Sequence, residues 1–457
     1  MKQIDIQHLY CRAGFGINPD QLKAWSKKNR ADVVEMLFQK SSKINKLEIN
    51  TSELDHFTAA VLLENKSKRR EFIDLSKEKL KGYNKLWIER LIDSNEILRE
   101  KMTLFWANHF VCRDTNIFHV QQYNNTLRSY ALGNFGDFVK AISKEPAMLK
   151  YLNNKQNRKQ KPNENFAREL MELFMLGEGQ YTENDIKESA RAFTGYNNNF
   201  EGDFKLRKLQ HDYGFKTVFR HRGRYDGDDI IDIILKQKQC ARFICRKIYK
   251  YFVNDTINED RVEELTESFF HDYDIEQLMR QVFMSDWFYE NTNIGTKIKS
   301  PIELLVGITQ IVPITFENEK DLFKIQKLLG QILLNPPNVA GWDGGKNWID
   351  ANTIMLRLKL PSILLTNARI AIKEKGDFED RFKTFHSKHR KNKFVSVQID
   401  WKTFEKNYQD ILTPHLKDYI IIPNLNPGTE KYLKTLSKSS KRDFCLQLMS
   451  LPEYQMC

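Results

Sequence analysis

The sequence has few of the features that mark secreted, membrane-spanning or zinc-stabilised proteins. Six cysteines are spread over 457 residues without a Cys-x-x-Cys pair, which argues against a disulfide framework and against a structural zinc site. The longest apolar runs, near 230–235 and 420–423, are far shorter than the roughly 20 residues that cross a bilayer. The first eight residues contain no signal-peptide stretch. We therefore expect a soluble, cytoplasmic protein without a membrane span.

The net charge of +12 would favour nucleic acid or another polyanion if it were concentrated on one face. The basic clusters at 66–70, 220–224 and 383–393 each have acidic residues nearby in the chain. We interpret them as solvated helix faces. A nucleic-acid partner is therefore not expected, although the charge keeps it as an alternative.

Apolar residues make up 41% of the chain and recur mostly at helical spacing. Leu98, Met102, Phe105 and His109 follow one another at offsets of four, three and four, which is one stripe of an α-helix. His109 is thus expected to point inward. Since no internal repeat or linker interrupts the pattern, the sequence predicts one all-α domain over residues 1–457.

Two adjacent helices should form an antiparallel αα-hairpin. The first is expected at 165–176 and ends before Gly177. The second follows Thr182, which forms a capping-box pattern with Asp185, and ends before Gly195. The short connection between the two helices leaves room for little more than a turn.

Two segments depart from the helical pattern. Residues 204–219 contain two alternating stretches around the turn-like sequence 211–214, which predicts a small β-hairpin. Residues 373–393 are strongly charged and are expected to form an exposed excursion. Further helices are predicted at 226–235, 241–252, 262–273, 275–284, 301–312, 322–329, 401–416 and 443–451, with an irregular connection at 335–347.

Read together, several motifs resemble those of the uncharacterised bacterial family known as domain of unknown function 1800. The most specific block is PNENFARELMELF at 162–174, followed by YTE at 181–183 and AFTG at 192–195. The resemblance extends over nearly the whole chain through HLYCRAGFG (8–16), FWANHF (105–110), LGNF (132–135), PAML (146–149), HD (211–212), KT (216–217), KSPIEL (299–304), GW (341–342) and SLPEYQ (450–455).

The resemblance implies little about activity, because the family has no settled function. Its members are commonly exported and are often encoded beside a sulfatase-like companion protein. The resemblance therefore implies a glycan substrate and a sulfatase-like partner as expectations. The present chain departs from the family pattern in showing no leader peptide.

The helix at 165–176 is the first candidate for a catalytic site. It is apolar on most sides but carries Glu169 and Glu172, and burying such charges is costly unless they are paired, metal-bound or neutralised. Spaced three residues apart, the two carboxyls share a helix face, which raises the pKa of one relative to the other. This is an outline of general acid and base catalysis. The same carboxylates could bind a divalent metal ion together with His109.

Structural interpretations of these residues compete with the catalytic one. Arg168 could pair with Glu164 or Glu172, and Arg191 with Glu169 or Glu172, in a salt-bridge network. His109 could be a hydrogen-bonded core residue. Asn108 could fix a helix contact instead of binding substrate.

His211 and Asp212, on the predicted hairpin turn, form a second candidate catalytic pair. An exposed histidine on a rigid loop can donate a proton or bind a ligand, but Asp212 could equally bond the local backbone of a turn. Trp342, in a glycine-rich loop, could stack on a sugar ring or serve as a buried aromatic anchor.

The leading hypothesis is a hydrolase-like or lyase-like enzyme that acts on a polysaccharide or a related anionic glycan. Glu169 and Glu172 would transfer protons, with help from His211 and Asp212, or bind a divalent metal ion with His109. The substrate would contact Asn108, Arg168, Arg191 and Trp342. The alternatives are a non-catalytic binding or scaffold protein and a nucleic-acid binder.

Overall fold

The computed structural model describes residues 1–366 and 395–457. Helices dominate these residues, and the strands among them form two-stranded sheets, so the all-α prediction is confirmed. The charged excursion predicted at 373–393 lies outside the described residues. Within the described part of the chain, no helix has both the length and the apolar character needed to span a bilayer.

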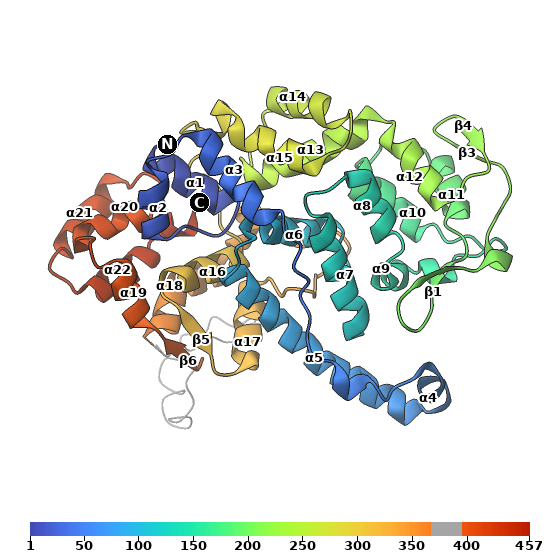
Figure 1. The fold of residues 1–457 in the computed structure, drawn as a ribbon, viewed down its shortest axis with the longest axis horizontal. Helices are drawn as coiled ribbons and strands as arrows, with labels where there is room; N and C mark the ends of the chain where they lie inside the picture. The colour runs from blue at the N-terminus through green and yellow to red at the C-terminus, as the bar shows by residue number, and fades with distance from the viewer. Residues whose placement is uncertain (367–394) are drawn as a thin grey trace.

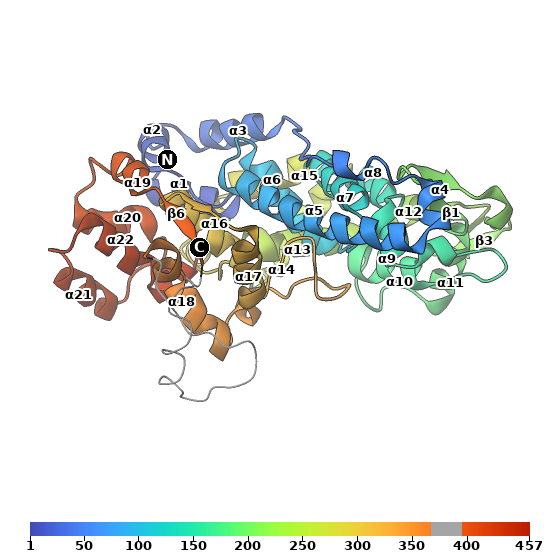
Figure 2. The same ribbon diagram turned by 90° about the horizontal axis from the view of Figure 1, so that it is seen from below.

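The two ends of the chain meet at one end of an elongated molecule (Figures 1 and 2). The amide of Gln3 donates a hydrogen bond to the Asp418 carbonyl at 2.9 Å, and Ile298 pairs with Met456 in an isolated β-bridge. The helices at this end are α1 (Gln3–Arg12), α2 (Pro19–Trp25), α3 (Arg30–Ser41), α18 (Ala351–Leu365), α19 (Trp401–Asn407), α20 (Lys417–Ile420), α21 (Pro427–Thr435) and α22 (Lys441–Met449).

The middle of the molecule is built around α6 (Ile97–His109). The long helix α5 (Lys66–Ile92) packs on α6 and then projects from the body, carrying the short α4 (Ala59–Glu64) at its tip (Figure 1). The other elements of this region are α7 (Ile117–Tyr130), α13 (Lys238–Phe252), α14 (Glu259–Phe269), α15 (Ile275–Met284), α16 (Pro301–Ile311), β5 (Ile314–Phe316), α17 (Glu319–Leu329) and β6 (Val397–Ile399), which pairs with β5.

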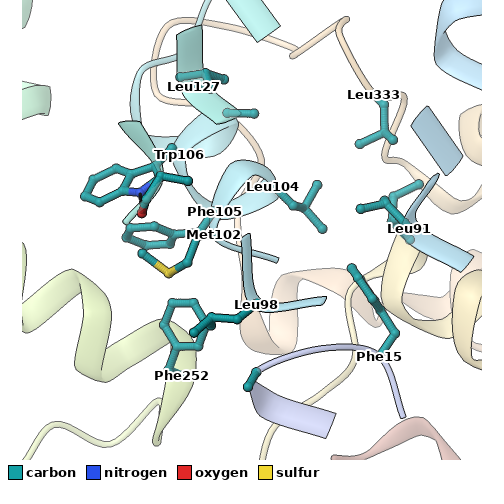
Figure 3. Close-up of a cluster of buried hydrophobic side chains, with 14 of the residues drawn as sticks. Phe15, Leu91, Leu98, Met102, Leu104, Phe105, Trp106, Leu127, Phe252 and Leu333 are labelled. Carbon is teal, nitrogen blue, oxygen red and sulfur yellow. Dashed lines mark hydrogen bonds between the residues drawn. The ribbon is translucent and has the colours of Figure 1, made fainter. Parts of the chain in front are cut away.

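Helix α6 supplies the centre of the apolar core. Its side chains Met102, Phe105 and Trp106 point toward Leu127 of α7 and Phe252 of α13 (Figure 3), and all of them are buried. The Trp106 indole satisfies its N–H by donating to the Ala131 carbonyl at 3.0 Å. Burying each large apolar side chain contributes about 1.5–3 kcal/mol, so α6 anchors the fold.

The opposite end of the molecule contains the predicted αα-hairpin. Helix α10 (Asn165–Glu169) continues as a π-helical segment (Leu170–Met175) and packs against α11 (Glu183–Ala192). Thr182 and Asp185 form the predicted capping box, and Gly177 adopts a positive φ of 89°, as a helix stop requires. The hairpin is confirmed, but the π-helical turn was not predicted.

The β-hairpin prediction for 204–219 was correct about the strands and wrong about their pairing. Strand β2 (Phe204–Leu206) pairs with β1 (Tyr196–Asn198), and β3 (Lys216–Val218) pairs with β4 (His221–Gly223). The segment between β2 and β3 runs through a 3-10 turn and the 211–214 loop. Each strand pairs with the nearest extended segment across a shorter turn, which is entropically cheaper to close.

The remaining helices at this end are α8 (Phe135–Ile142), α9 (Pro146–Tyr151) and α12 (Gly227–Leu235) (Figure 1). Helix α12 begins after Asp226, whose carboxylate caps it, close to the predicted start at 226. Most of the other predicted helices also lie within a few residues of their observed bounds. The helix predicted at 401–416 instead ends at Asn407 and resumes as a 3-10 turn at Thr413–Leu416.

Candidate functional site

Glu169 and Glu172 lie at the junction of α10 and the π-helical segment. Both side chains are half-buried, so neither is fully solvated. The Tyr181 hydroxyl, which lies just before α11, donates a hydrogen bond to Glu172 at 2.5 Å. π-Helical turns are rare and are frequently found at functional sites, and this one carries an acidic pair.

The Glu169 carboxyl has no ion pair or hydrogen bond with any described residue. Burial raises the pKa of Glu169 first, and the negative charge of Glu172 raises it further, while Arg168 acts in the opposite direction. The effect of the neighbouring Glu172 charge agrees with the sequence prediction, but burial is the larger cause of the raised pKa. A carboxyl of this kind can hold a proton and release it.

The two arginines proposed as salt-bridge partners bind other acids. Arg168 donates to both Glu183 oxygens at 2.9 Å and to Glu164 at 3.2 Å. Its predicted pair with Glu164 is therefore confirmed, and its alternative pair with Glu172 is not formed. The prediction that these guanidinium groups neutralise Glu169 and Glu172 is wrong, because Glu183 at the start of α11 attracts Arg168 instead.

Arg191 lies near the other end of α11. Its guanidinium donates to Asp212 at 2.7 and 3.3 Å and to both oxygens of Glu188 at 2.9 and 3.0 Å. The Arg191 guanidinium consequently does not bind Glu169 or Glu172. It fixes the 211–215 loop, so a direct contact with substrate at Glu169 is not supported for this residue.

His109 is buried, as the sequence predicted, and pairs with a residue that the sequence did not suggest. Its Nε2 donates to the Phe174 carbonyl at 3.0 Å, and its Nδ1 accepts from Lys247 of α13 at 3.2 Å. Lys247 also donates to the Leu173 carbonyl at 2.8 Å. The pair caps the carbonyl end of the π-helical segment and holds it against α6 and α13.

Burial also sets the charge of this pair. Desolvation lowers the pKa of Lys247 to about 7, since no carboxylate of the described residues pairs with its amine. Desolvation first, and then the nearby Lys247 charge, hold the pKa of His109 well below its usual value. Both groups are therefore close to neutral under slightly alkaline conditions.

The tentative metal site at His109, Glu169 and Glu172 is not assembled. Among the described residues, no three His, Cys, Asp or Glu side chains lie close enough to hold a metal ion. Both ring nitrogens of His109 are occupied by Phe174 and Lys247. An imidazole engaged in this way cannot also turn a lone pair toward the two glutamates.

His211 and Asp212 form a structural turn. His211 is buried, with Nδ1 at 2.8 Å from the Thr194 carbonyl, so the expectation of an exposed histidine is wrong. The Asp212 carboxylate accepts from Arg191 and from the Gly214 amide, and these bonds outweigh burial to lower its pKa. The contacts of His211 and Asp212 agree with the turn interpretation. A catalytic role for this pair stays a prediction.

The Asn108 side chain is hydrogen-bonded to the backbone of Trp342. The Asn108 amide donates to the Trp342 carbonyl at 3.1 Å and accepts from the Trp342 amide at 2.7 Å. Gly341, at a φ of 85°, lies so close to Asn108 that a Cβ there would clash. Asn108 thus fixes the 341–342 loop and not a contact between helices, and its predicted contact with substrate stays a prediction.

Trp342 is buried, with 6% of its surface exposed, as expected of an aromatic anchor, and its exposed part lines a surface pocket of about 220 Å³. Two cationic side chains, Arg113 and Lys327, line the same pocket, together with Pro336 and Pro337. Arg113 gives the wall of this pocket a positive charge.

Sequence reasoning missed Lys247, Tyr181 and Arg113. Lys247 follows Ile244 by three residues and Cys240 by seven, so it occupies an apolar-stripe position of α13, and this is a readable signal. Tyr181 and Arg113 carry no such signal. Their roles depend on which helices pack together, and local periodicity does not contain that information.

The whole chain was compared with known families, curated proteins and solved structures. Residues 8–456 match the model of a family described as "Protein of unknown function (DUF1800)". The chain belongs to the DUF1800 family. No curated protein and no solved structure matches it. Membership in the DUF1800 family therefore confirms the resemblance seen in the motifs, while any function has to be argued from the site itself.

Proposed function

We propose that this protein is an enzyme that uses Glu169 and Glu172 for proton transfer on an anionic polysaccharide. One observation carries the proposal: Glu169 lies half-buried beside a second carboxylate without a cationic partner among the described residues. A salt-bridge network for folding would have matched that charge. Perturbed carboxyls without a structural partner are characteristic of acid and base catalysts.

The two carboxyls take different roles. Glu169 is the proton donor, because burial and Glu172 raise its pKa. Glu172, which accepts a hydrogen bond from the Tyr181 hydroxyl, is the base. In hydrolysis, Glu169 protonates the glycosidic oxygen while Glu172 accepts a proton from the attacking water. In β-elimination, Glu172 accepts the carbon-bound proton and Glu169 protonates the same leaving oxygen.

The pocket at Trp342 supports an anionic sugar as the substrate. The part of Trp342 that lines the pocket is apolar, and Arg113 provides charge for a carboxylate or a sulfate.

The test is turnover of polyuronates and sulfated polysaccharides by the wild type and by Glu169→Gln and Glu172→Gln. Each substitution keeps the shape and removes the proton chemistry, so we expect turnover to fall by about 10²–10⁴-fold. Reducing ends without ultraviolet absorbance would identify hydrolysis. An unsaturated product would identify elimination.

Glu178→Gln is the matched control, because Glu178 is exposed and lies just beyond the same helix. It should leave turnover unchanged. Full turnover by Glu169→Gln would contradict the proposal. Tight glycan binding without turnover by the wild type would instead favour the non-catalytic binding role.

A further inference from the structure

The end of the molecule that carries α11 also carries a strongly basic surface. We define the basic end surface as six exposed cationic side chains, namely Arg158, Lys159, Lys161, Arg220, Arg222 and Arg224. None of the six forms an ion pair with a residue that the structure describes. Two acids near β3, Glu188 and Asp212, are already bound to Arg191.

The six cations come from two parts of the chain that backbone hydrogen bonds connect. The 158–161 turn, closed by an Arg158 to Lys161 bridge, joins the 208–215 loop through the Lys159 amide and the Gln210 carbonyl at 2.8 Å. That loop leads into β3, which pairs with β4. β3, β4 and α11 lie together at one end of the molecule (Figure 1).

Two of the arginines are held in place by an exposed aromatic ring. The guanidinium carbons of Arg222 and Arg224 lie 5.4 and 5.2 Å from the centre of the Phe215 ring. Arg222 lies in β4 and Arg224 follows directly after its end, and both guanidinium groups meet the same ring. Their guanidinium groups occupy the ring that a nucleic-acid base would need for stacking. This arrangement favours recognition of repeated negative charges.

The tip of the β3–β4 hairpin has a strained backbone and carries a cationic side chain. Phe219 and Arg220 have φ angles of 46° and 67°, where glycine or asparagine is the usual choice. Backbone strain of this kind clusters at binding sites. An arginine at this position places one charge of the basic end surface at the hairpin tip.

The hairpin tip also leads toward the acidic pair. The Phe219 amide donates to Asp185 at 2.8 Å, and Asp185 forms the capping box with Thr182. The next residue back, Tyr181, donates to Glu172. A polymer lying along β4 would therefore reach the start of α11, beside the candidate catalytic residues.

We propose that the basic end surface binds a sulfated or carboxylated polysaccharide chain and guides it toward Glu169 and Glu172. The choice of a glycan as the polyanion rests on the proposed function. The existence of a polyanion site does not, because it depends on the unpaired cations, on the Phe215 clamp and on the tip at Arg220.

The experiment measures the affinity of the full chain for dextran sulfate by fluorescence anisotropy, with uncharged dextran and single-stranded DNA as comparison probes. We expect the double variant Arg222→Gln/Arg224→Gln to bind dextran sulfate about tenfold more weakly and to show a smaller salt dependence, because two ionic contacts are lost. The double variant Arg69→Gln/Arg70→Gln removes the same charge from exposed positions on α5. It should bind like the wild type.

Arg220→Gly separates binding from folding. It removes both the charge and the strain at the tip, so the melting temperature should rise while the affinity for dextran sulfate falls. Glu178→Gln should bind dextran sulfate as the wild type does, and the binding measurement needs no turnover, so a failure of the catalytic proposal would leave the binding result readable. Equal affinity of wild type and the Arg222/Arg224 double variant, or tighter binding of DNA than of dextran sulfate, would overturn the glycan surface.

Discussion

Two regions of the molecule contain acidic residues that are partly or fully buried, and these residues differ in whether they have partners of opposite charge. In the core, Arg128 binds both oxygens of Glu100 at 2.7 and 3.1 Å, and Trp87 donates to the same carboxylate at 3.3 Å. Asn124 and Asn125 satisfy the rest of the guanidinium. At the junction of α10 and the π-helical segment, Glu169 has no such partner among the described residues.

The difference separates charges kept for folding from a charge kept for chemistry. A buried charge that serves folding is matched by an opposite charge and by hydrogen bonds, because an unmatched one is expensive. Glu100 meets that requirement. Glu169 has no matching charge of this kind, although Arg168 is its neighbour in the chain. The contrast is the physical basis for proposing a proton-transfer role at Glu169.

The largest expected effect on the free energy of unfolding comes from the Glu100–Arg128 ion pair. Arg128→Met should lower the free energy of unfolding by about 3–5 kcal/mol, because the buried Glu100 carboxylate loses both guanidinium hydrogen bonds and keeps only Trp87 and the more distant Arg90, at 3.8 Å. Urea unfolding at pH 7 measures the change. The double variant Glu100→Met/Arg128→Met should regain most of the loss, since a hydrophobic pair needs no ionic match. A loss below about 1 kcal/mol in the single variant would make the pair dispensable, against this account.

An intermediate effect is expected from Lys247, whose amine donates to His109 and to the Leu173 carbonyl but has no carboxylate partner among the described residues. Its pKa of about 7 in the folded protein lies below its usual 10.5. Between these values the unfolded chain binds more protons, so stability rises with pH. Relative to Lys247→Met, the wild type should gain about 2–4 kcal/mol between pH 7 and pH 10.5. Urea unfolding at both pH values gives this difference.

Lys250→Met serves as the matched control for this titration, because Lys250 is exposed on the same helix. It should leave the pH dependence of the wild type unchanged. An identical pH dependence for the wild type and Lys247→Met would mean that the Lys247 amine keeps its charge when folded. His109 acts on the acid side, where stability is lost as the pH falls below 6.5 and the unfolded state takes up a proton.

The smallest effect on stability is expected at Glu169. Because its pKa is raised in the folded protein, its ionisation opposes folding, and the stability it retains at low pH is lost as the pH rises through the folded pKa. Glu169→Gln should therefore be neutral or more stable by up to about 1 kcal/mol at pH 7. The gain should vanish below pH 4. Destabilisation by Glu169→Gln in urea would place this residue with the structural acids.

The sequence predicted those features that depend on neighbouring residues. The inward position of His109, the capping box at Thr182 and the stop at Gly177 all follow from local spacing, and the structure confirms them. Helix periodicity and caps are properties of a short window of chain. The two glutamates were identified in the same way, from charge within an apolar helix.

The features that were missed depend on contacts between distant segments. Lys247 contacts His109 because α13 packs beside α6. Arg168 pairs with Glu183 instead of Glu172 because α11 folds back on α10. The pairing of β2 with β1 likewise depends on which connecting turn costs less entropy to close. A single sequence contains no direct record of such choices.

The most direct test of the central claim is a carbon-13 NMR titration of the Glu169 carboxyl in the folded protein. We predict a midpoint above the usual value of 4.5 and a lower midpoint in Glu172→Gln, because the neighbouring charge is removed. A midpoint at or below 4.5 that does not respond to Glu172→Gln would show a matched, solvated carboxylate and would contradict the account.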